Sequence, residues 1–154
     1  MAENTHYEGG CQCGALRYEI TAAPLVLYVC HCSECQTQSG SAFGMSLAVP
    51  SDAFSIRSGT PKVWARSSAS GHGVACAFCA DCGVRIYHRP ERKPGTINVK
   101  PGTLDDTSWL DPAAHLWTGS AQPWINLDDG RIRSAAQPDD FRAIRAAWQQ
   151  RSGI

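Results

Sequence analysis

The chain has 154 residues, of which 43% are hydrophobic and 18% charged, so it fits one domain with an ordinary core and is neither disordered nor membrane-spanning. Basic and acidic residues number 14 each, which argues against a strong attraction to nucleic acid or anionic membranes. No apolar run approaches the roughly 18 residues of a transmembrane helix, and residues 1–6 lack the pattern of a secretory signal. We therefore expect one cytoplasmic domain over residues 1–154.

A glycine-flanked C-x-C unit, Cys11-Gln12-Cys13, comes first along the chain. Glycines on both sides allow a tight turn that points two sulfur atoms at one ion. Apolar and polar residues then alternate over residues 16–20, which predicts a half-buried strand. A short apolar run over residues 25–29 predicts a second strand that leads into the next cysteines.

The central stretch places three cysteines within six residues, Cys30-His31-Cys32-Ser33-Glu34-Cys35. We expect this segment to form a tight turn that holds three sulfur ligands on one side of a metal ion. Residues 36–43 are mostly small and hydroxyl-bearing, so we predict a loop that passes close to the metal. Alternation over residues 43–49 predicts another strand.

The second half of the chain begins with short strand patterns and Gly/Pro turns. Residues 67–73 are rich in serine and glycine and predict a flexible turn. Cys79-Ala80-Asp81-Cys82, with Gly83 directly after it, is typical of a zinc knuckle. The strands are predicted over residues 54–57, 62–66, 74–78, 84–88 and 96–100.

Helix signals are convincing only near the C-terminus. Pro138 and two aspartates favour a helix start, and Phe141, Ile144 and Trp148 share one face, so we predict a helix over residues 138–151. Short strands with one terminal helix indicate a mostly β domain.

Eight cysteines in a chain without a leader indicate metal binding rather than disulfides, because cytosolic thiols are kept reduced. The two distant pairs together make a closed four-thiolate set, which is typical of a structural zinc. The central three cysteines leave a fourth position for water or substrate, as catalytic zinc sites do. We therefore expect two Zn²⁺ per chain, a structural one on Cys11, Cys13, Cys79 and Cys82 and a catalytic one on Cys30, Cys32 and Cys35.

An alternative is that the second zinc is also structural and is closed by Cys76, His31 or another residue. In a strand over residues 74–78, Cys76 shares a face with Val74 and Phe78. Free cysteine packs like a small hydrophobic residue, so we favour core packing for Cys76 over zinc closure or a reactive thiol.

Several polar side chains near the cysteines have both a functional and a structural interpretation. His31 is a candidate proton carrier or a residue that only satisfies backbone groups. Glu34 is a candidate general base or a solvent-facing carboxylate. Ser39 and Ser41 could donate to thiolates, although we favour simple loop-forming roles, and His115 could face the site or cap the surface.

Six segments that span roughly residues 7–130 occur in a characteristic order. They are Gly10-Cys11-Gln12-Cys13-Gly14-Ala15, Cys30-His31-Cys32-Ser33-Glu34-Cys35, Ser39-Gly40-Ser41-Ala42-Phe43, Phe78-Cys79-Ala80-Asp81-Cys82-Gly83, Gly102-Thr103-Leu104-Asp105-Asp106 and His115-Leu116-Trp117 with Trp124. Together they resemble the glutathione-dependent formaldehyde-activating enzyme family, which also includes centromere protein V.

The resemblance implies a small zinc-binding β-tent fold with the same two zinc sites. It also implies a carbon–sulfur lyase-type enzyme that adds a thiol, glutathione or similar, to formaldehyde or another small aldehyde. Two positions depart from the family pattern: Gln36 and Thr37 stand where members often carry basic residues, and Cys76-Ala77 precedes Phe78 where members tend to have an arginine. The alternative function is a non-enzymatic zinc module that binds or carries a thiol or a protein partner.

Overall fold

The computed structural model describes residues 5–68 and 71–154. The chain divides into two compact units: Met1–Pro24 with Leu47–Ser108, called unit 1, and Leu25–Ser46 with Trp109–Ile154, called unit 2. The turn predicted over residues 67–73 lies partly outside the described residues. The prediction of one domain over residues 1–154 stays a prediction.

Unit 1 contains a small antiparallel sheet in the order β1-β2-β5. Its central strand buries Tyr18 and Ile20, which are 1% and 0% exposed, while the residues between them face outward. This is the alternation expected of a strand with one face on a core. The strands are β1 (Tyr7–Gly10), β2 (Arg17–Ile20) and β5 (Phe54–Ser58).

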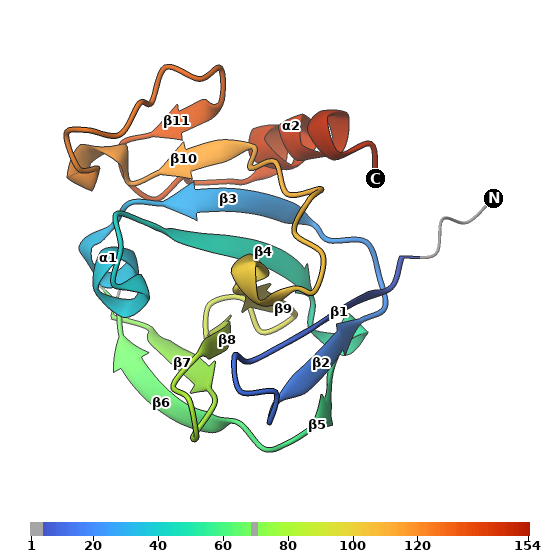
Figure 1. Ribbon diagram of the computed structural model, residues 1–154. Helices are drawn as coiled ribbons and strands as arrows, with labels where there is room; N and C mark the ends of the chain where they lie inside the picture. The colour runs from blue at the N-terminus through green and yellow to red at the C-terminus, as the bar shows by residue number, and fades with distance from the viewer. Residues whose placement is uncertain (1–4, 69–70) are drawn as a thin grey trace. The chain divides into compact units, whose positions relative to one another are not determined.

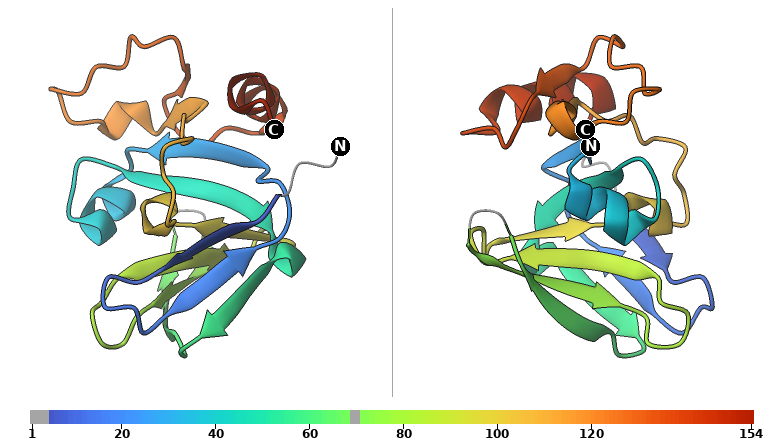
Figure 2. Two further views of the ribbon diagram at one scale, coloured as in Figure 1. Left: turned by 45° about the vertical axis from the view of Figure 1, so that its right-hand side comes forward. Right: turned by 90° about the vertical axis from the view of Figure 1, so that its left-hand side faces the viewer.

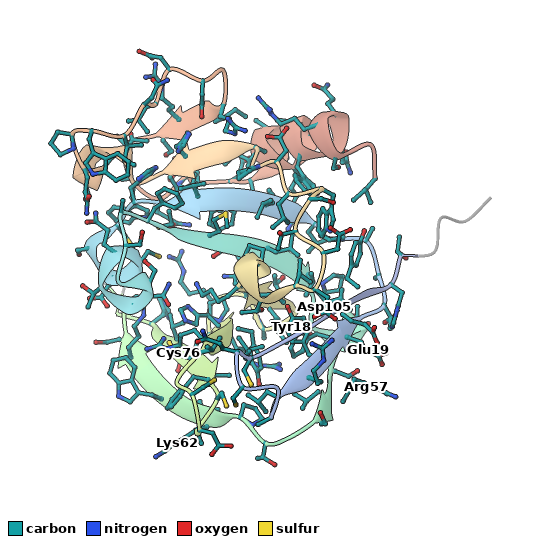
Figure 3. The ribbon with its side chains drawn as sticks, in the orientation of Figure 1. Tyr18, Glu19, Arg57, Lys62, Cys76 and Asp105 are labelled. Carbon is teal, nitrogen blue, oxygen red and sulfur yellow. The ribbon has the colours of Figure 1, made fainter. Side chains whose placement is uncertain are left out.

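A larger antiparallel sheet completes unit 1 (Figure 1). Tyr18 stacks on Phe54 at 5.2 Å between ring centroids, and Phe54 meets the ring of Tyr87 edge-on at 4.9 Å, so the two sheets pack through these aromatic side chains. Tyr18 is labelled in Figure 3. The larger sheet comprises the Leu47–Pro50 part of β4 (Gly44–Pro50), then β9 (Thr96–Val99), β8 (Arg85–Pro90), β7 (Gly73–Phe78) and β6 (Lys62–Ser67).

Cys76 lies midway along β7, the strand next to the edge strand β6 of this larger sheet (Figure 3). The side chain is 0% exposed, as expected for core packing, and its Sγ lies 3.7 Å from the carbonyl oxygen of Val74. It belongs to neither cluster of metal-ligating groups among the described residues.

Replacing Cys76 with alanine should therefore cost about 1 kcal/mol of unfolding free energy, as a small core truncation does, and leave the zinc content unchanged. Urea unfolding and elemental analysis measure the two quantities. A variant that loses a zinc ion would make Cys76 a ligand.

Unit 2 is built on three short parallel strands in the order β11-β10-β3 (Figure 1). The C-terminal helix α2 (Arg142–Ser152) contacts β3, as both views of Figure 2 also show. Ile144 and Trp148 are its buried residues, and the ring of Tyr28 meets that of Phe141 at 5.6 Å. The strands are β3 (Val26–Cys30), β10 (Ala114–Leu116) and β11 (Ile132–Ser134).

The mostly β fold with a C-terminal helix is confirmed, and all eight predicted strands form within two residues of their expected bounds. The prediction of a loop directly after the central cysteines is wrong, because Ser33–Ser39 form a short helix, α1. The terminal helix begins at Arg142 and not at Pro138, because the carboxylate of Asp140 accepts the backbone N–H of Arg142 from outside the helix. None of the described helices is long and apolar enough to cross a membrane.

Candidate metal centres

The first cysteine cluster lies in unit 1, and its four sulfur atoms lie within 4.8 Å of one another. The Sγ of Cys13 is 3.6 Å from that of Cys11 and 3.7 Å from that of Cys79. Zinc–sulfur bonds of about 2.3 Å in a tetrahedron place the sulfurs about 3.8 Å apart. The four cysteines predicted as structural ligands, Cys11, Cys13, Cys79 and Cys82, therefore fit a Zn²⁺ ion in both donor type and spacing.

Two turns of similar design hold these sulfurs. The N–H of Cys11 bonds to the carbonyl of Leu16 and the N–H of Gly14 bonds back to Cys11, closing the turn between β1 and β2. Cys79 and Gly83 make the equivalent pair of bonds between β7 and β8. Gly14 and Gly83 have φ of 81° and 79°, a conformation that glycine adopts without steric cost. A glycine after the second cysteine is thus required at both turns.

In the first cluster, backbone hydrogen bonds favour the thiolate forms of Cys82 and Cys13. Hydrogen bonds from the backbone at Val84 and Cys13 lower the pKa of the Cys82 thiol to about 6. A backbone hydrogen bond at Ala15 favours the thiolate of Cys13. The pKa of Cys13 nevertheless rises to about 12, because Cys11 and the other sulfurs compete for negative charge. A bound cation would offset this competition between the sulfurs, and metal binding should weaken as the pH falls because protons compete for the thiolates.

The second cluster lies in unit 2, where Cys30, Cys32 and Cys35 place their three sulfur atoms within 4.8 Å of one another. Cys30 ends β3, Cys32 is the N-cap of α1, and Cys35 lies in the first turn of that helix. The three residues predicted as the second zinc site are thus brought together. A strand end followed by a helix start, and not a simple turn, produces the spacing.

The start of α1 itself stabilises negative charge on one of these sulfurs. The backbone N–H of Cys35 donates to the Sγ of Cys32 at 3.4 Å. Hydrogen bonds from Cys30 and Cys35 lower the pKa of Cys32 to about 2, and the same contacts raise the pKa of Cys30. The backbone and sulfur contacts thus favour a thiolate at Cys32, and three clustered sulfurs are a donor set suited to a soft divalent cation such as Zn²⁺.

The backbone runs close to Cys35 where β4 begins. A Cβ added at Gly44 would lie 3.2 Å from the Cβ of Cys35 and 3.5 Å from its Sγ. The first distance is tighter than an ordinary contact, so a glycine at this position lets the strand pass close to the Cys35 side chain. Gly40, with φ of 61°, ends α1 and turns the chain toward that strand.

A buried chain of polar side chains adjoins the second cluster. His31, which is 0% exposed, makes a 2.9 Å hydrogen bond through Nε2 to Nδ1 of His115. Nε2 of His115 lies 2.9 Å from a carboxylate oxygen of Asp129, which also accepts a hydrogen bond from Arg131 at 2.8 Å. His115 must therefore donate at one ring nitrogen, and the carboxylate fixes which one.

Burial and hydrogen bonding, including that from Arg131, shift the pKa values of His31 and Asp129 in this hydrogen-bonded series. Burial, with a smaller contribution from His115, holds the pKa of His31 below its usual range. Burial acts to raise the pKa of the Asp129 carboxyl, but hydrogen bonds from His115 and Arg131 hold it well below its usual range. The buried side chains of His31 and His115 thus connect the residue directly after β3, which lies between Cys30 and Cys32, to β10.

Replacing Asp129 with asparagine should destabilise the protein by about 1–2 kcal/mol, because two charge-assisted hydrogen bonds lose their ionic acceptor. Urea unfolding of the zinc-loaded protein measures the loss. The neighbouring Asp128 provides a matched control, since its side chain is 85% exposed and Asp128→Asn should change nothing measurable. Equal effects of the two substitutions would contradict a structural role for the buried chain.

An open groove of about 430 Å³ lies along α1 in unit 2. Gln36 is one of its lining residues, and its side-chain amide donates to the carbonyls of His31 and Ser120 at 2.7 and 2.9 Å. Gln122 donates to Gln36 at 3.2 Å. The lining is polar but uncharged, comprising Gln36, Thr37, Gly40, Ser41, Ala42 and Gln122.

The other candidates from the sequence have more modest roles. Glu34 is exposed on the first turn of α1. Ser39 donates to the carbonyls of Gln36 and Phe43, which supports the loop-forming interpretation, whereas Ser41 lines the groove. His115 faces inward and not toward the surface. Asp129 was missed, because an aspartate beside a glycine in a polar segment is typical of a turn and nothing local links it to a histidine fourteen residues earlier.

Comparison with known proteins agrees with this geometry. The family model described as "Glutathione-dependent formaldehyde-activating enzyme" matches residues 6–120. A protein of Penicillium rubens named "Putative glutathione-dependent formaldehyde-activating enzyme" is 31% identical over 147 residues, covering 90% of this chain and 69% of that protein. A Talaromyces marneffei protein of the same name is 26% identical over 144 residues, covering 90% of this chain and 71% of its own.

A solved structure supports the fold. The crystal structure of a Rhodobacter sphaeroides protein matches with a TM-score of 0.50 at 16% identity, covering 82% of this chain and 98% of that one. At this identity the likeness concerns the fold alone. The matched family model spans most of the chain, including both cysteine clusters. The chain therefore belongs to the glutathione-dependent formaldehyde-activating enzyme family.

Proposed function

We propose that this protein is a carbon–sulfur lyase-type enzyme that joins a thiol to formaldehyde or another small aldehyde at a zinc ion held by Cys30, Cys32 and Cys35. The observation that carries the proposal is the number of ligands: among the described residues the second cluster offers three sulfurs, against four in the first. Three protein ligands are typical of a catalytic zinc with room for an exchangeable fourth group. Family membership and the names of the two fungal relatives support the choice of glutathione and formaldehyde.

The proposed reaction adds a thiol across the carbonyl group of the aldehyde, so that the C=O double bond becomes a single bond. The S–H bond of the thiol breaks, a bond forms between its sulfur and the aldehyde carbon, and the carbonyl oxygen gains the proton to give a hydroxymethyl thioether. When bound at the second cluster, Zn²⁺ would lower the pKa of a coordinated thiol and so supply the nucleophile at neutral pH.

The residues of the chain have separate tasks in this proposal. Cys30, Cys32 and Cys35 hold the metal, and the N–H of Cys35 donates to the Sγ of Cys32. The chain from His31 through His115 to Asp129 fixes the strand end that carries the first two ligands. The groove along α1 is adjacent in sequence to Cys35 and has a polar, uncharged lining suited to the amide groups of a peptide-like thiol.

The proposal is tested by measuring turnover rather than binding. NMR exchange spectroscopy reports the rate at which formaldehyde moves between hydrate and S-hydroxymethyl forms, so an enzyme must raise that rate above the uncatalysed exchange. We expect zinc-loaded protein to raise it with glutathione and to discriminate among glutathione, cysteine and 2-mercaptoethanol. No acceleration with any of the three thiols, together with saturable thiol binding, would make the protein a non-enzymatic thiol-binding module instead.

A further inference from the structure

A group of basic side chains shares one face of the larger sheet of unit 1. Trp64, Cys76, His88 and Asn98 stand directly opposite one another on β6, β7, β8 and β9. Residues two apart in a strand share a face, so Arg66 lies on this face beyond Trp64. Lys100 continues from β9 in the same way, with its backbone N–H bonded to Ile86 at 2.8 Å. Cys76, labelled in Figure 3, marks the centre of this face.

Arg85 adds a third cation to the group. Its Nη1 donates to Nε2 of His88 at 3.1 Å, and its guanidinium carbon lies 5.9 Å from the ring centroid of the exposed Trp64. Because arginine only donates, His88 must accept at Nε2 and be neutral. Burial, assisted by the positive charges of Lys100, Arg85 and Arg66, lowers the pKa of His88 to about 2.

These residues form a basic cluster that comprises Arg66, Arg85, His88 and Lys100. Within residues 5–68 and 71–154, no ion pair includes Arg66 or Arg85. The Nε of Arg66 is buried and has no hydrogen-bond partner there. Buried donors are nearly always paired, and like charges brought together away from water repel one another, so both features favour an added anion.

We propose that the basic cluster binds the carboxylate of a small organic anion. Two guanidinium groups present planar forks that match the two oxygens of a carboxylate, and Lys100 adds a further positive charge. Arg66 and Arg85 are only half-buried, and Trp64 beside them is 54% exposed, so an anion can reach them from solvent. The neutral imidazole of His88 fixes Arg85 in place without adding a competing charge.

Such a carboxylate has two sources, a free organic acid or a thiol compound that bears carboxylates, as glutathione does. The site is separate from the proposed turnover, because none of its residues belongs to either cysteine cluster in the described part of the chain. Binding can therefore be measured with probes that do not react. Succinate represents a free acid, and S-methylglutathione represents the thiol compound, since its methylated sulfur cannot ionise.

The experiment is a titration of the zinc-loaded protein at low salt, followed by two-dimensional amide NMR and the indole signal of Trp64. We expect saturable shifts with succinate at Arg85, His88 and Trp64, and none with the neutral analogue succinamide. Arg66→Gln should weaken succinate binding about tenfold, as loss of a charge-assisted hydrogen bond does. Arg89→Gln is the matched control: it removes the same charge from β8 at an exposed position and should leave binding unchanged.

The outcomes separate the sources and test the site. If S-methylglutathione competes with succinate and loses affinity in Arg66→Gln, the site serves a thiol compound; if succinate alone binds, it serves a free acid. Both results support the proposal. Non-saturable shifts, equal binding of succinamide, or equal weakening by Arg89→Gln would overturn it. Should Arg66→Gln fail to fold, Arg66→Lys keeps the charge without the fork and should still weaken succinate binding several-fold.

Discussion

Serine in place of Cys79 or Cys11 should leave the protein unfolded or aggregated. The four-sulfur cluster connects the turn between β1 and β2 to the turn between β7 and β8, so it holds the two sheets of unit 1 together. A structural zinc of this kind contributes on the order of 10 kcal/mol, which exceeds or equals the net stability of most domains of this size. The loss of one thiolate should therefore remove most of the folding free energy of unit 1.

Thermal melts followed by circular dichroism measure this effect, with Cys76→Ala as the matched control. That variant removes a thiol that is equally buried but outside both clusters, and it should melt cooperatively at a temperature only slightly below that of the parent. If Cys79→Ser melts like Cys76→Ala, the first cluster does not hold a structural metal.

The corresponding change at the second cluster should have a different result. Cys35→Ser should leave the protein folded, with one zinc ion fewer per chain and without the acceleration of hydroxymethyl exchange. The three sulfurs come from one short segment of unit 2, so no distant strands depend on them. The serine hydroxyl is a poor ligand for zinc at neutral pH, and two remaining thiolates do not make a site.

Elemental analysis, far-UV circular dichroism and the exchange assay together check this prediction. Cys76→Ala should again retain both metal ions and full acceleration. A Cys35→Ser protein that unfolds as readily as Cys79→Ser would make the second zinc structural, which is the alternative left open by the spacing alone.

Much of the strand pattern could be predicted from the sequence, because apolar and polar residues alternate in strands such as β2 and β4, and glycine or proline lies near many strand ends. The strand β1 (Tyr7–Gly10), which ends in two glycines, was not predicted. The elements that were missed lack such local signals. Residues 33–39 form α1 because Cys32 caps the helix and Gly40 ends it, but the segment has no apolar periodicity to indicate a helix. The strands β10 and β11 are three residues each, too short for alternation to be visible.

The cysteine ligands could be predicted for a different reason: metal geometry demands short fixed spacings that are visible in the chain. The surrounding groups could not. Asp129 meets His115 only through the pairing of β10 and β11 and the loop between them. Arg66 lies on β6, Arg85 on β8 and Lys100 directly after β9, so their common face depends on the register of these strands.

The central claim, that one cluster is closed and the other keeps a position for a thiol, is tested most directly by cadmium NMR. Cadmium replaces zinc at thiolate sites, and its resonance position depends on the number of coordinating sulfurs. We predict two resonances of equal area, one unaffected by glutathione and one that moves toward the position of the four-sulfur site when glutathione is added. A single resonance, or two that both stay in place at saturating glutathione, would contradict the account.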